Sequence, residues 1–221
     1  MKQAAFFIRL SNREKRNLNI MVINMNERSI YILLTDTGTW FSRMIKLYTK
    51  APYNHVSISL DENLEELYSF GRKVYYNPLS AGFIKEGVER GVFWYKKDTK
   101  CILFRLTVSE QQYRNILMRI YRFRCFQDQY RYNLLGVMGI ALNKRIIREN
   151  AFTCSQFVAS VLTVSGIYAF EKYIEMITPT DIMNIPELEL VYEGRLRDYK
   201  RKNCSGHDSN LLDWNQFKAN Y

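Results

Sequence analysis

Residues 52–60 read Pro-Tyr-Asn-His-Val-Ser-Ile-Ser-Leu, a turn that leads into a strictly alternating segment. From His55 to Leu60, apolar side chains alternate with a histidine and two serines, which is typical of a β-strand with two different faces. The chain has only two histidines, and imidazole is the side chain that titrates near neutral pH. The stretch therefore predicts a strand that begins with a candidate catalytic base.

Further strands are predicted on both sides of this stretch. Arg28–Thr35 is a compact apolar run rich in β-forming residues, and Glu66–Arg72 returns from a turn to complete a hairpin. Residues 75–100 contain glycine, asparagine and isolated aromatic residues, which predicts a long irregular excursion with short strands. Cys101–Thr107 and Glu189–Leu196 complete the expected strands.

Helices are predicted mainly in the second half of the chain. Ser109 begins a capping-box pattern, and Thr153 caps a helix within Phe152–Ser165 that Gly166 ends. The other predicted helices are Trp40–Lys50, Asn133–Leu142 as a short helix or packed loop, and one that begins at Thr178-Pro179. Strands first, helices later and one late strand indicate an α+β fold.

The length of 221 residues suits a single domain, which we place at residues 28–198. Residues 1–27 are expected to be an N-terminal extension outside the fold, and residues 199–221 a polar, basic C-terminal tail. The apolar patch near the N-terminus is too short for a secretory signal, and no apolar run reaches about 18 residues. A cytoplasmic location is therefore expected.

The chain carries 32 Lys and Arg against 22 Asp and Glu, a formal net charge of +10. With 10 glycines and 4 prolines, low-complexity and collagen-like classes are excluded. There is no zinc-finger spacing, bZIP pattern or RNP-like aromatic motif, so no specific nucleic-acid motif is present. A solvated basic face is the simpler interpretation, and attraction to anionic lipid, cell-wall polymer or nucleic acid is the alternative.

Four scattered cysteines are expected to be reduced thiols. Cys101 lies in an apolar strand and Cys125 at the end of an arginine-rich helix, so both are interpreted as structural. Cys204 and His207 have the spacing of half a zinc site, but the sequence offers no second half. A disordered tail is therefore favoured there, and neither a metal nor a cofactor is predicted.

Cys154 is the most informative thiol, because it lies at the start of a predicted helix. Unpaired N–H groups and the positive end of the helix dipole stabilise an anion at this place. With a histidine as base, such a thiol can act as the nucleophile of an acyl-transfer site. A buried, unreactive cysteine is the equally weighted alternative.

A polar side chain on the return strand of the hairpin could orient His55. One register places Phe70 opposite His55 with Tyr68 diagonal to it, and a shift by one residue places Ser69 opposite. The sequence leaves both registers open. Glu66, Tyr68 and Ser69 are therefore the candidates for the third residue of the site.

Four segments together resemble a known family: Ile-Leu-Leu-Thr at 32–35, the aromatic segment 39–49, the histidine stretch 52–60, and Phe-Thr-Cys-Ser-Gln-Phe-Val at 152–158. They are similar to the circularly permuted papain-like cysteine hydrolases, which are permuted relatives of the NlpC-type cell-wall peptidases. The lecithin:retinol acyltransferase clan belongs with them. In this family an early strand carries the histidine, a following strand supplies a polar third residue, and the cysteine lies far downstream at a helix N-terminus.

The resemblance implies a permuted papain-like fold, in which an antiparallel sheet packs against a helical part that carries Cys154. It implies a Cys154 thiolate that attacks an acyl carbon, with His55 as base and then as acid. Tyr53 and Asn54, which precede His55, and Gln156 are the predicted substrate neighbours. No cofactor is implied.

Water or another acceptor would then resolve the acyl-enzyme, so the implied activity is that of a cysteine-dependent amidase, peptidase, thioesterase or acyltransferase. The expected substrate is a small-molecule, peptide or lipid-like acyl compound, and an anionic surface is a further expected partner. The alternative function is a non-catalytic basic binding module on the same fold. It would show ordinary thiol reactivity and salt-sensitive binding.

Overall fold

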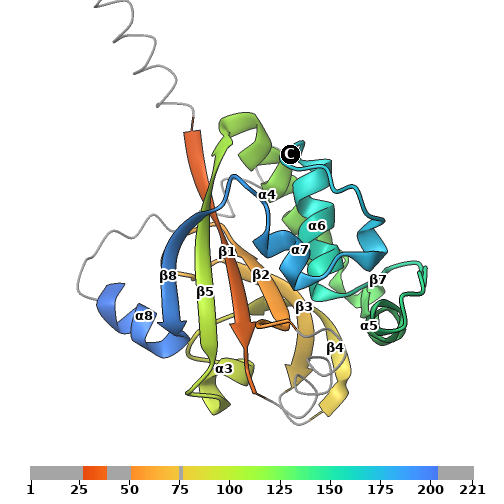
Figure 1. The fold of residues 1–221 in the computed structure, drawn as a ribbon, viewed down its shortest axis with the longest axis horizontal. Coiled ribbons are helices and arrows are strands. Elements are labelled where there is room, and N and C mark those ends of the chain that lie inside the picture. Colours follow the sequence, from red (N-terminus) through yellow and green to blue (C-terminus); the bar gives the residue numbers. More distant parts are fainter. Residues whose placement is uncertain (1–26, 39–50, 75–76, 204–221) are drawn as a thin grey trace, which may run out of the picture.

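The computed structural model describes residues 27–38, 51–74 and 77–203. Within this part of the chain, six strands form one antiparallel sheet in the order β4-β3-β2-β1-β5-β8 (Figure 1). The strands are β1 (Glu27–Asp36), β2 (His55–Ser59), β3 (Leu67–Val74), β4 (Asn77–Glu86), β5 (Lys100–Ser109) and β8 (Glu189–Arg195). Together with the helices, this sheet confirms the predicted α+β class.

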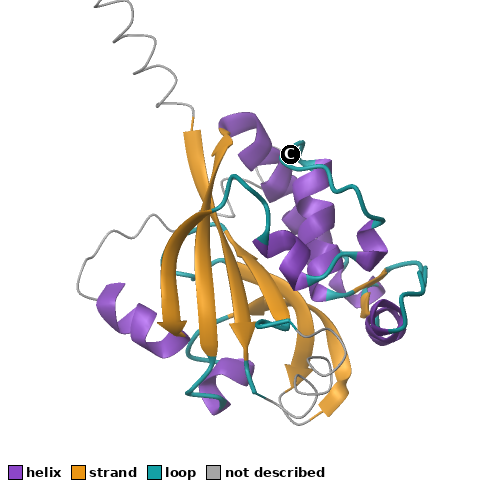
Figure 2. Cartoon of the chain, viewed as in Figure 1, coloured by secondary structure: helices purple, strands orange, loops and turns teal. Residues whose placement is uncertain are grey.

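The helices and short elements surround this sheet (Figure 2). The described helices are α3 (Gly91–Tyr95), α4 (Glu110–Cys125), α5 (Leu134–Ala141), α6 (Cys154–Val164), α7 (Pro179–Met183) and α8 (Leu196–Asn203). The short elements are the 3₁₀ turns η1 (Gln127–Gln129) and η2 (Ile174–Met176), and the parallel strand pair β6 (Arg131–Tyr132) and β7 (Ala151–Phe152).

Strand β1 lies in the interior of the sheet and is buried on both faces. Ile30, Ile32 and Leu34 pack into a large apolar cluster on one face, while Tyr31 and Leu33 belong to a smaller cluster on the other. A strand with both faces covered needs apolar residues at every position. This explains why its sequence is a continuous apolar run and not an alternating one.

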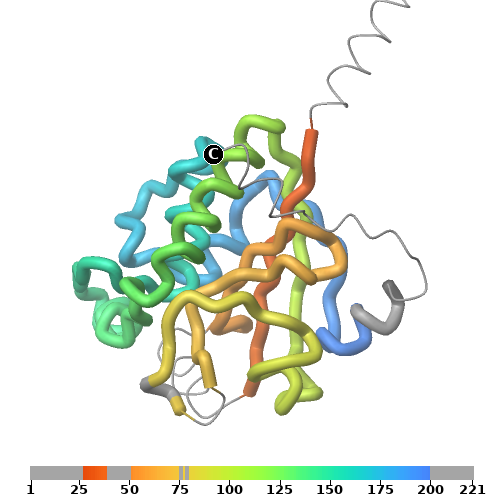
Figure 3. Tube along the Cα trace, turned by 180° about the vertical axis from the view of Figure 1, so that it is seen from behind, coloured from red at the N-terminus to blue at the C-terminus, as the bar shows by residue number. Residues whose placement is uncertain are grey.

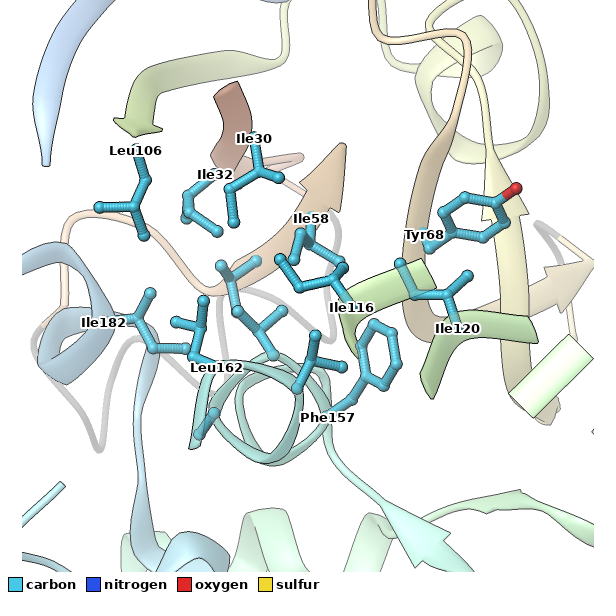
Figure 4. Close-up of a cluster of buried hydrophobic side chains, with 14 of the residues drawn as sticks. Ile30, Ile32, Ile58, Tyr68, Leu106, Ile116, Ile120, Phe157, Leu162 and Ile182 are labelled. Carbon is cyan, nitrogen blue, oxygen red and sulfur yellow. The ribbon is translucent and has the colours of Figure 1, made fainter. Parts of the chain in front are cut away.

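The large cluster joins the sheet to α4 and α6 (Figure 4). The ring centroid of Phe157 in α6 lies 5.1 Å from that of Phe123 in α4 and 5.4 Å from that of Phe70 in β3. Every residue of α6 from Cys154 to Leu162 is buried. The helix that begins with Cys154 is therefore fixed by packing around its circumference.

Helices cover both faces of the sheet. Residues of α4, α6 and α7 contribute to the large cluster, whereas α3 and α8 supply Phe93, Leu196 and Tyr199 to the smaller one. Figures 1 and 3, which view the molecule from opposite sides, show α4, α6 and α7 on one side of the sheet and α8 on the other.

The helix boundaries follow from capping interactions that the sequence already indicates. Ser109 Oγ accepts a hydrogen bond from Gln112 N at 3.2 Å, and Gln112 Oε1 accepts one from Ser109 N at 2.9 Å, which completes a capping box. Gly166 follows the last turn of α6 with a φ of 69°, the left-handed conformation that glycine tolerates. Asn133 caps α5, so the segment predicted as a short helix or a packed loop is a helix.

One prediction about the chain's organisation is wrong. Residues 75–100 are not mainly irregular, because they contain β4, a ten-residue strand paired with β3. Residues 199–203 of the predicted tail lie in α8. The predicted helix Trp40–Lys50 and residues 1–26 and 204–221 lie outside the described part of the chain. Among the described helices, none is long and apolar enough to cross a membrane.

Candidate active site

His55 and Cys154 occupy the first positions of two elements that pack together. His55 is the first residue of β2, Cys154 is the first residue of α6, and α6 packs against β2. The Cys154 thiol lies close enough to the imidazole to raise the pKa of His55. The structure therefore brings together two residues that lie 99 positions apart in the sequence.

The start of α6 is fixed by a second capping box. Thr153 Oγ1 accepts a hydrogen bond from Gln156 N at 3.1 Å, and Gln156 Oε1 accepts one from Thr153 N at 3.4 Å. Ser155 Oγ donates to the carbonyl of Ile177, which ties the first turn to the segment before α7. Helix geometry leaves the N–H groups of Cys154 and Ser155 without an intrahelical acceptor.

Glu86, the last residue of β4, is the acidic partner of His55. Its Oε1 lies 2.8 Å from His55 Nε2, and its Oε2 accepts a hydrogen bond from Ser57 Oγ. The same Ser57 hydroxyl lies 3.3 Å from His55 Nε2. The side chains of His55 and Glu86 are 17% and 10% exposed, so the pair is largely withdrawn from water.

These contacts set the charge of the imidazole. Burial disfavours the charged ring and would lower the pKa of His55, but the Glu86 carboxylate and the contact with Cys154 outweigh it. Together they raise the pKa from 6.5 to about 10. His55 is therefore an imidazolium at neutral pH, held between a carboxylate and a thiol.

Tyr132 of β6 lies close to this group. Burial raises the pKa of its hydroxyl, the charge of Cys154 adds to the rise, and Arg72 opposes it. Tyr132 therefore stays neutral at physiological pH. Both Cys154 and Arg72 are therefore near enough to affect the pKa of the Tyr132 hydroxyl.

A cavity of about 260 Å³ opens beside His55 and Glu86. Both residues line it, together with Asn54 and Tyr132. The remaining described lining comes from the residue after β1, from β3 and β4, from the turn between β4 and α3, and from α3 itself. The cavity gives a substrate a place next to the imidazole.

The hairpin register differs from both registers considered for the sequence. Tyr68 pairs with Ile58. Extended along the two strands, this register places Gly71 opposite His55. A Cβ atom added to Gly71 would lie 3.6 Å from His55 Cε1, in agreement with this register. The predictions that Phe70 or Ser69 lies opposite His55 are therefore wrong.

The three candidates for the third residue have other partners. Ser69 Oγ donates to the carbonyl of Val56 at 2.7 Å, and the Tyr68 hydroxyl donates to Glu66. Glu66 also pairs with Lys85 Nζ at 2.5 Å. The carboxylate that contacts His55 comes instead from Glu86, which lies in the segment interpreted as irregular.

A sequence signal for Glu86 existed but was weak. The run Gly-Phe-Ile-Lys-Glu-Gly at 82–87 has β-forming residues between two glycines, and its acidic residue ends the strand. Nothing local links that residue to a histidine 31 positions earlier.

The predicted substrate neighbours occupy three different environments. Asn54 lines the cavity, and its Nδ2 donates to Asp36 Oδ1 at 3.1 Å. The Tyr53 hydroxyl donates to Glu193 at 3.2 Å. Glu193 lies in β8, the edge strand at the end of the sheet opposite β4. Gln156 is buried within the capping box of α6. Of the three, Asn54 is the one that borders the cavity.

The two other described thiols are not part of the cavity lining. Cys101 is buried in the smaller apolar cluster, and burial raises its pKa to about 12. Cys125 is exposed at the end of α4, and Cys204 and His207 lie outside the described residues. Within the described ranges, no group of His, Cys, Asp and Glu side chains is arranged to hold a metal ion.

Compared with family models, curated proteins and solved structures, the chain has no significant match. The inference of function therefore starts from the side chains of the site.

Proposed function

We propose that the protein is a cysteine hydrolase or acyltransferase that cleaves an amide, peptide or (thio)ester bond. One observation carries the proposal: His55 contacts the Cys154 thiol and the Glu86 carboxylate at the same time. A thiol and a carboxylate that both interact with one imidazole are the parts of an activated sulfur nucleophile.

The proposed reaction begins with a proton on His55 and a thiolate at Cys154. The sulfur attacks the acyl carbon, the carbonyl oxygen becomes an oxyanion, and His55 gives its proton to the leaving amine, alcohol or thiol. The N–H groups of Cys154 and Ser155, which have no acceptor within the helix, would stabilise the oxyanion. Water or another acceptor then gives its proton to His55, attacks the thioester and releases Cys154.

The order of the elements supports a permuted papain-like fold for this enzyme. The histidine begins an early strand, the carboxylate ends a later strand of the same sheet, and the cysteine begins a helix further along the chain. This is the order that the resembled family has, with Glu86 in the place of the third residue. We propose this fold together with the function.

The test is acylation by 4-nitrophenyl acetate, which releases 4-nitrophenolate and leaves an acetyl thioester. Mass spectrometry of the wild type should place the acetyl group on Cys154. Cys154→Ser should lose it there, and His55→Gln should slow its formation at least about 100-fold, in the range of general acid–base effects. The exposed Cys125 is the internal reference for ordinary thiol reactivity. Acetylation of Cys125 ahead of Cys154 would overturn the proposal.

A second candidate function, binding to an anionic membrane surface, is favoured by the surface around α5. Leu135, Met138, Leu142 and Ile147 are large apolar residues that are between 48% and 63% exposed. Figures 1 and 2 show α5 at the margin of the molecule. The exposed Arg148 follows closely in the chain, so apolar and cationic groups lie together.

Vesicle sedimentation tests this second function. The wild type should sediment with vesicles of phosphatidylcholine and phosphatidylserine, less with phosphatidylcholine alone, and less at high salt. Met138→Gln with Ile147→Gln should reduce sedimentation, whereas Val164→Gln, also exposed but on α6, should not. Equal sedimentation of all three proteins would contradict membrane binding through α5.

A further inference from the structure

The cavity beside His55 is lined by an excess of cations. Arg72 and Lys73 of β3, Lys85 of β4 and Arg90 before α3 border it, against Glu86 as the acidic residue among its described lining. Glu86 is engaged by His55, and Lys85 is paired with Glu66. Within the described chain, neither Lys73 nor Arg90 forms an ion pair, and both are exposed. Their charges are therefore available to a ligand.

Two glycines make room for the stems of these side chains. A Cβ atom on Gly87 would collide with Arg90 Nε and lie 2.8 Å from Arg90 Cγ, so any larger residue would displace the arginine. A Cβ atom on Gly82 would lie 3.2 Å from Lys73 Cε. The Lys73 side chain therefore packs on the glycine backbone of β4, and the Arg90 side chain on that of the turn after β4.

From this arrangement we infer that the cavity binds a substrate whose non-reacting end carries an anionic group, a carboxylate or a phosphate, which is attracted by the charges of Lys73 and Arg90. The inference rests on the proposed acyl-transfer function and names its substrate class. The reacting carbonyl lies toward His55, and the anionic end lies toward Lys73 or Arg90.

The experiment compares two alkylating agents of similar size, the anion iodoacetate and the neutral iodoacetamide. Both transfer a carbon to the Cys154 sulfur and release iodide. The ratio of their rate constants at fixed pH reports the attraction of an anion, because thiolate content affects both rates equally. The imidazolium of His55 contributes to this ratio in every variant that retains it.

The double variant Lys73→Gln, Arg90→Gln should lower the iodoacetate-to-iodoacetamide ratio about fivefold to tenfold, as expected for the loss of two exposed charges. Lys100→Gln with Arg122→Gln removes the same net charge from exposed positions outside the cavity lining and is the matched control. Its ratio should stay within about twofold of the wild type. An equal fall in both double variants, or no fall in either, would overturn the inference.

Protection by added anions distinguishes the two sources and separates this inference from the proposed function. If glutarate slows the iodoacetamide reaction and inorganic phosphate does not, the anionic group of the substrate is a carboxylate. If only inorganic phosphate slows it, the group is a phosphate. Protection by neither would overturn the inference. If Cys154 instead reacts no faster than Cys125 with iodoacetamide, the proposed function fails. In that case, calorimetry measures the binding of the two anions to the wild type and to the double variant Lys73→Gln, Arg90→Gln. Weaker binding to the variant supports the anion site independently of catalysis, and equal binding overturns it.

Discussion

Replacing Glu86 by glutamine removes one charge from the site and keeps the shape of the side chain. In the wild type, Glu86 Oε1 lies 2.8 Å from His55 Nε2 and the other oxygen accepts from Ser57. The amide can accept one of these hydrogen bonds, but it cannot neutralise the imidazolium. Glu86→Gln therefore tests the electrostatic role of the carboxylate with little change in packing.

The magnitude follows from the contribution of the carboxylate to the pKa of His55. A neighbouring opposite charge shifts a pKa by about 1–3 units, and each unit corresponds to about 1.4 kcal/mol. The pKa of His55, raised to about 10 in the wild type, should fall by that amount. At pH 6 the variant should then lose about 1–4 kcal/mol of unfolding free energy.

The pH dependence has a defined sign. Because the folded-state pKa of His55 lies above its unfolded value of 6.5, the folded protein keeps a proton that the unfolded chain releases. The stabilisation is complete below pH 6.5 and is lost as pH rises toward 10. The difference between wild type and Glu86→Gln should therefore be largest at pH 6 and narrow by pH 9. Contributions common to both proteins, such as that of Cys101, cancel in this difference.

Urea denaturation at pH 6, 7.5 and 9 measures this effect, and the pH profile of Cys154 alkylation provides a second readout. Glu66→Gln is the matched control, because Glu66 is also a buried carboxylate and is bonded to Lys85 and Tyr68. It should cost stability by an amount that does not change between pH 6 and pH 9. If Glu86→Gln gives the same flat difference, or if Glu66→Gln alone alters the alkylation profile, the assignment of Glu86 is refuted.

Three further changes have expected outcomes. Ser57→Ala leaves one oxygen of Glu86 without its donor and should cost about 1–3 kcal/mol in urea denaturation, with a smaller change in the pH profile than Glu86→Gln. Thr153→Ala removes the cap of α6 and should cost about 1 kcal/mol, and hydrogen exchange at the amide of Gln156 should become faster. Phe157→Ala empties a fully buried position and should cost about 3–5 kcal/mol by thermal or chemical denaturation; a loss below about 1 kcal/mol would contradict the packing of α6.

Features governed by neighbouring residues were predictable from the sequence. The capping boxes at Ser109 and Thr153 depend on side chains three positions apart, and the sequence places both helices correctly. The strand that begins at His55 follows from simple alternation. In each of these cases the determining contacts lie within one turn or one strand.

The hairpin register and the acidic partner of His55 depend on longer distances. Register is set by how complete strands pack, and a one-residue slip exchanges the two faces. The register of β3 with β4 also shifts between Arg72 and Val74, which alternation in the sequence does not predict. Residues 77–81, with asparagine, proline and glycine nearby, resemble a loop in composition, although they lie in β4.

His55 and Glu86 come from strands that are not neighbours, because β3 lies between β2 and β4. Their side chains meet across Gly71, where an added Cβ atom would lie 3.6 Å from His55 Cε1, 3.8 Å from Glu86 Oε1 and 3.1 Å from Ile84 Cδ1. A larger residue at 71 would occupy the space through which the two side chains approach. In sequence, a glycine within a strand indicates only a weakened strand or a bulge. Its role here follows from the residues on both sides of it in the sheet, which is why the site could be located through His55 and Cys154 but completed only from the structure.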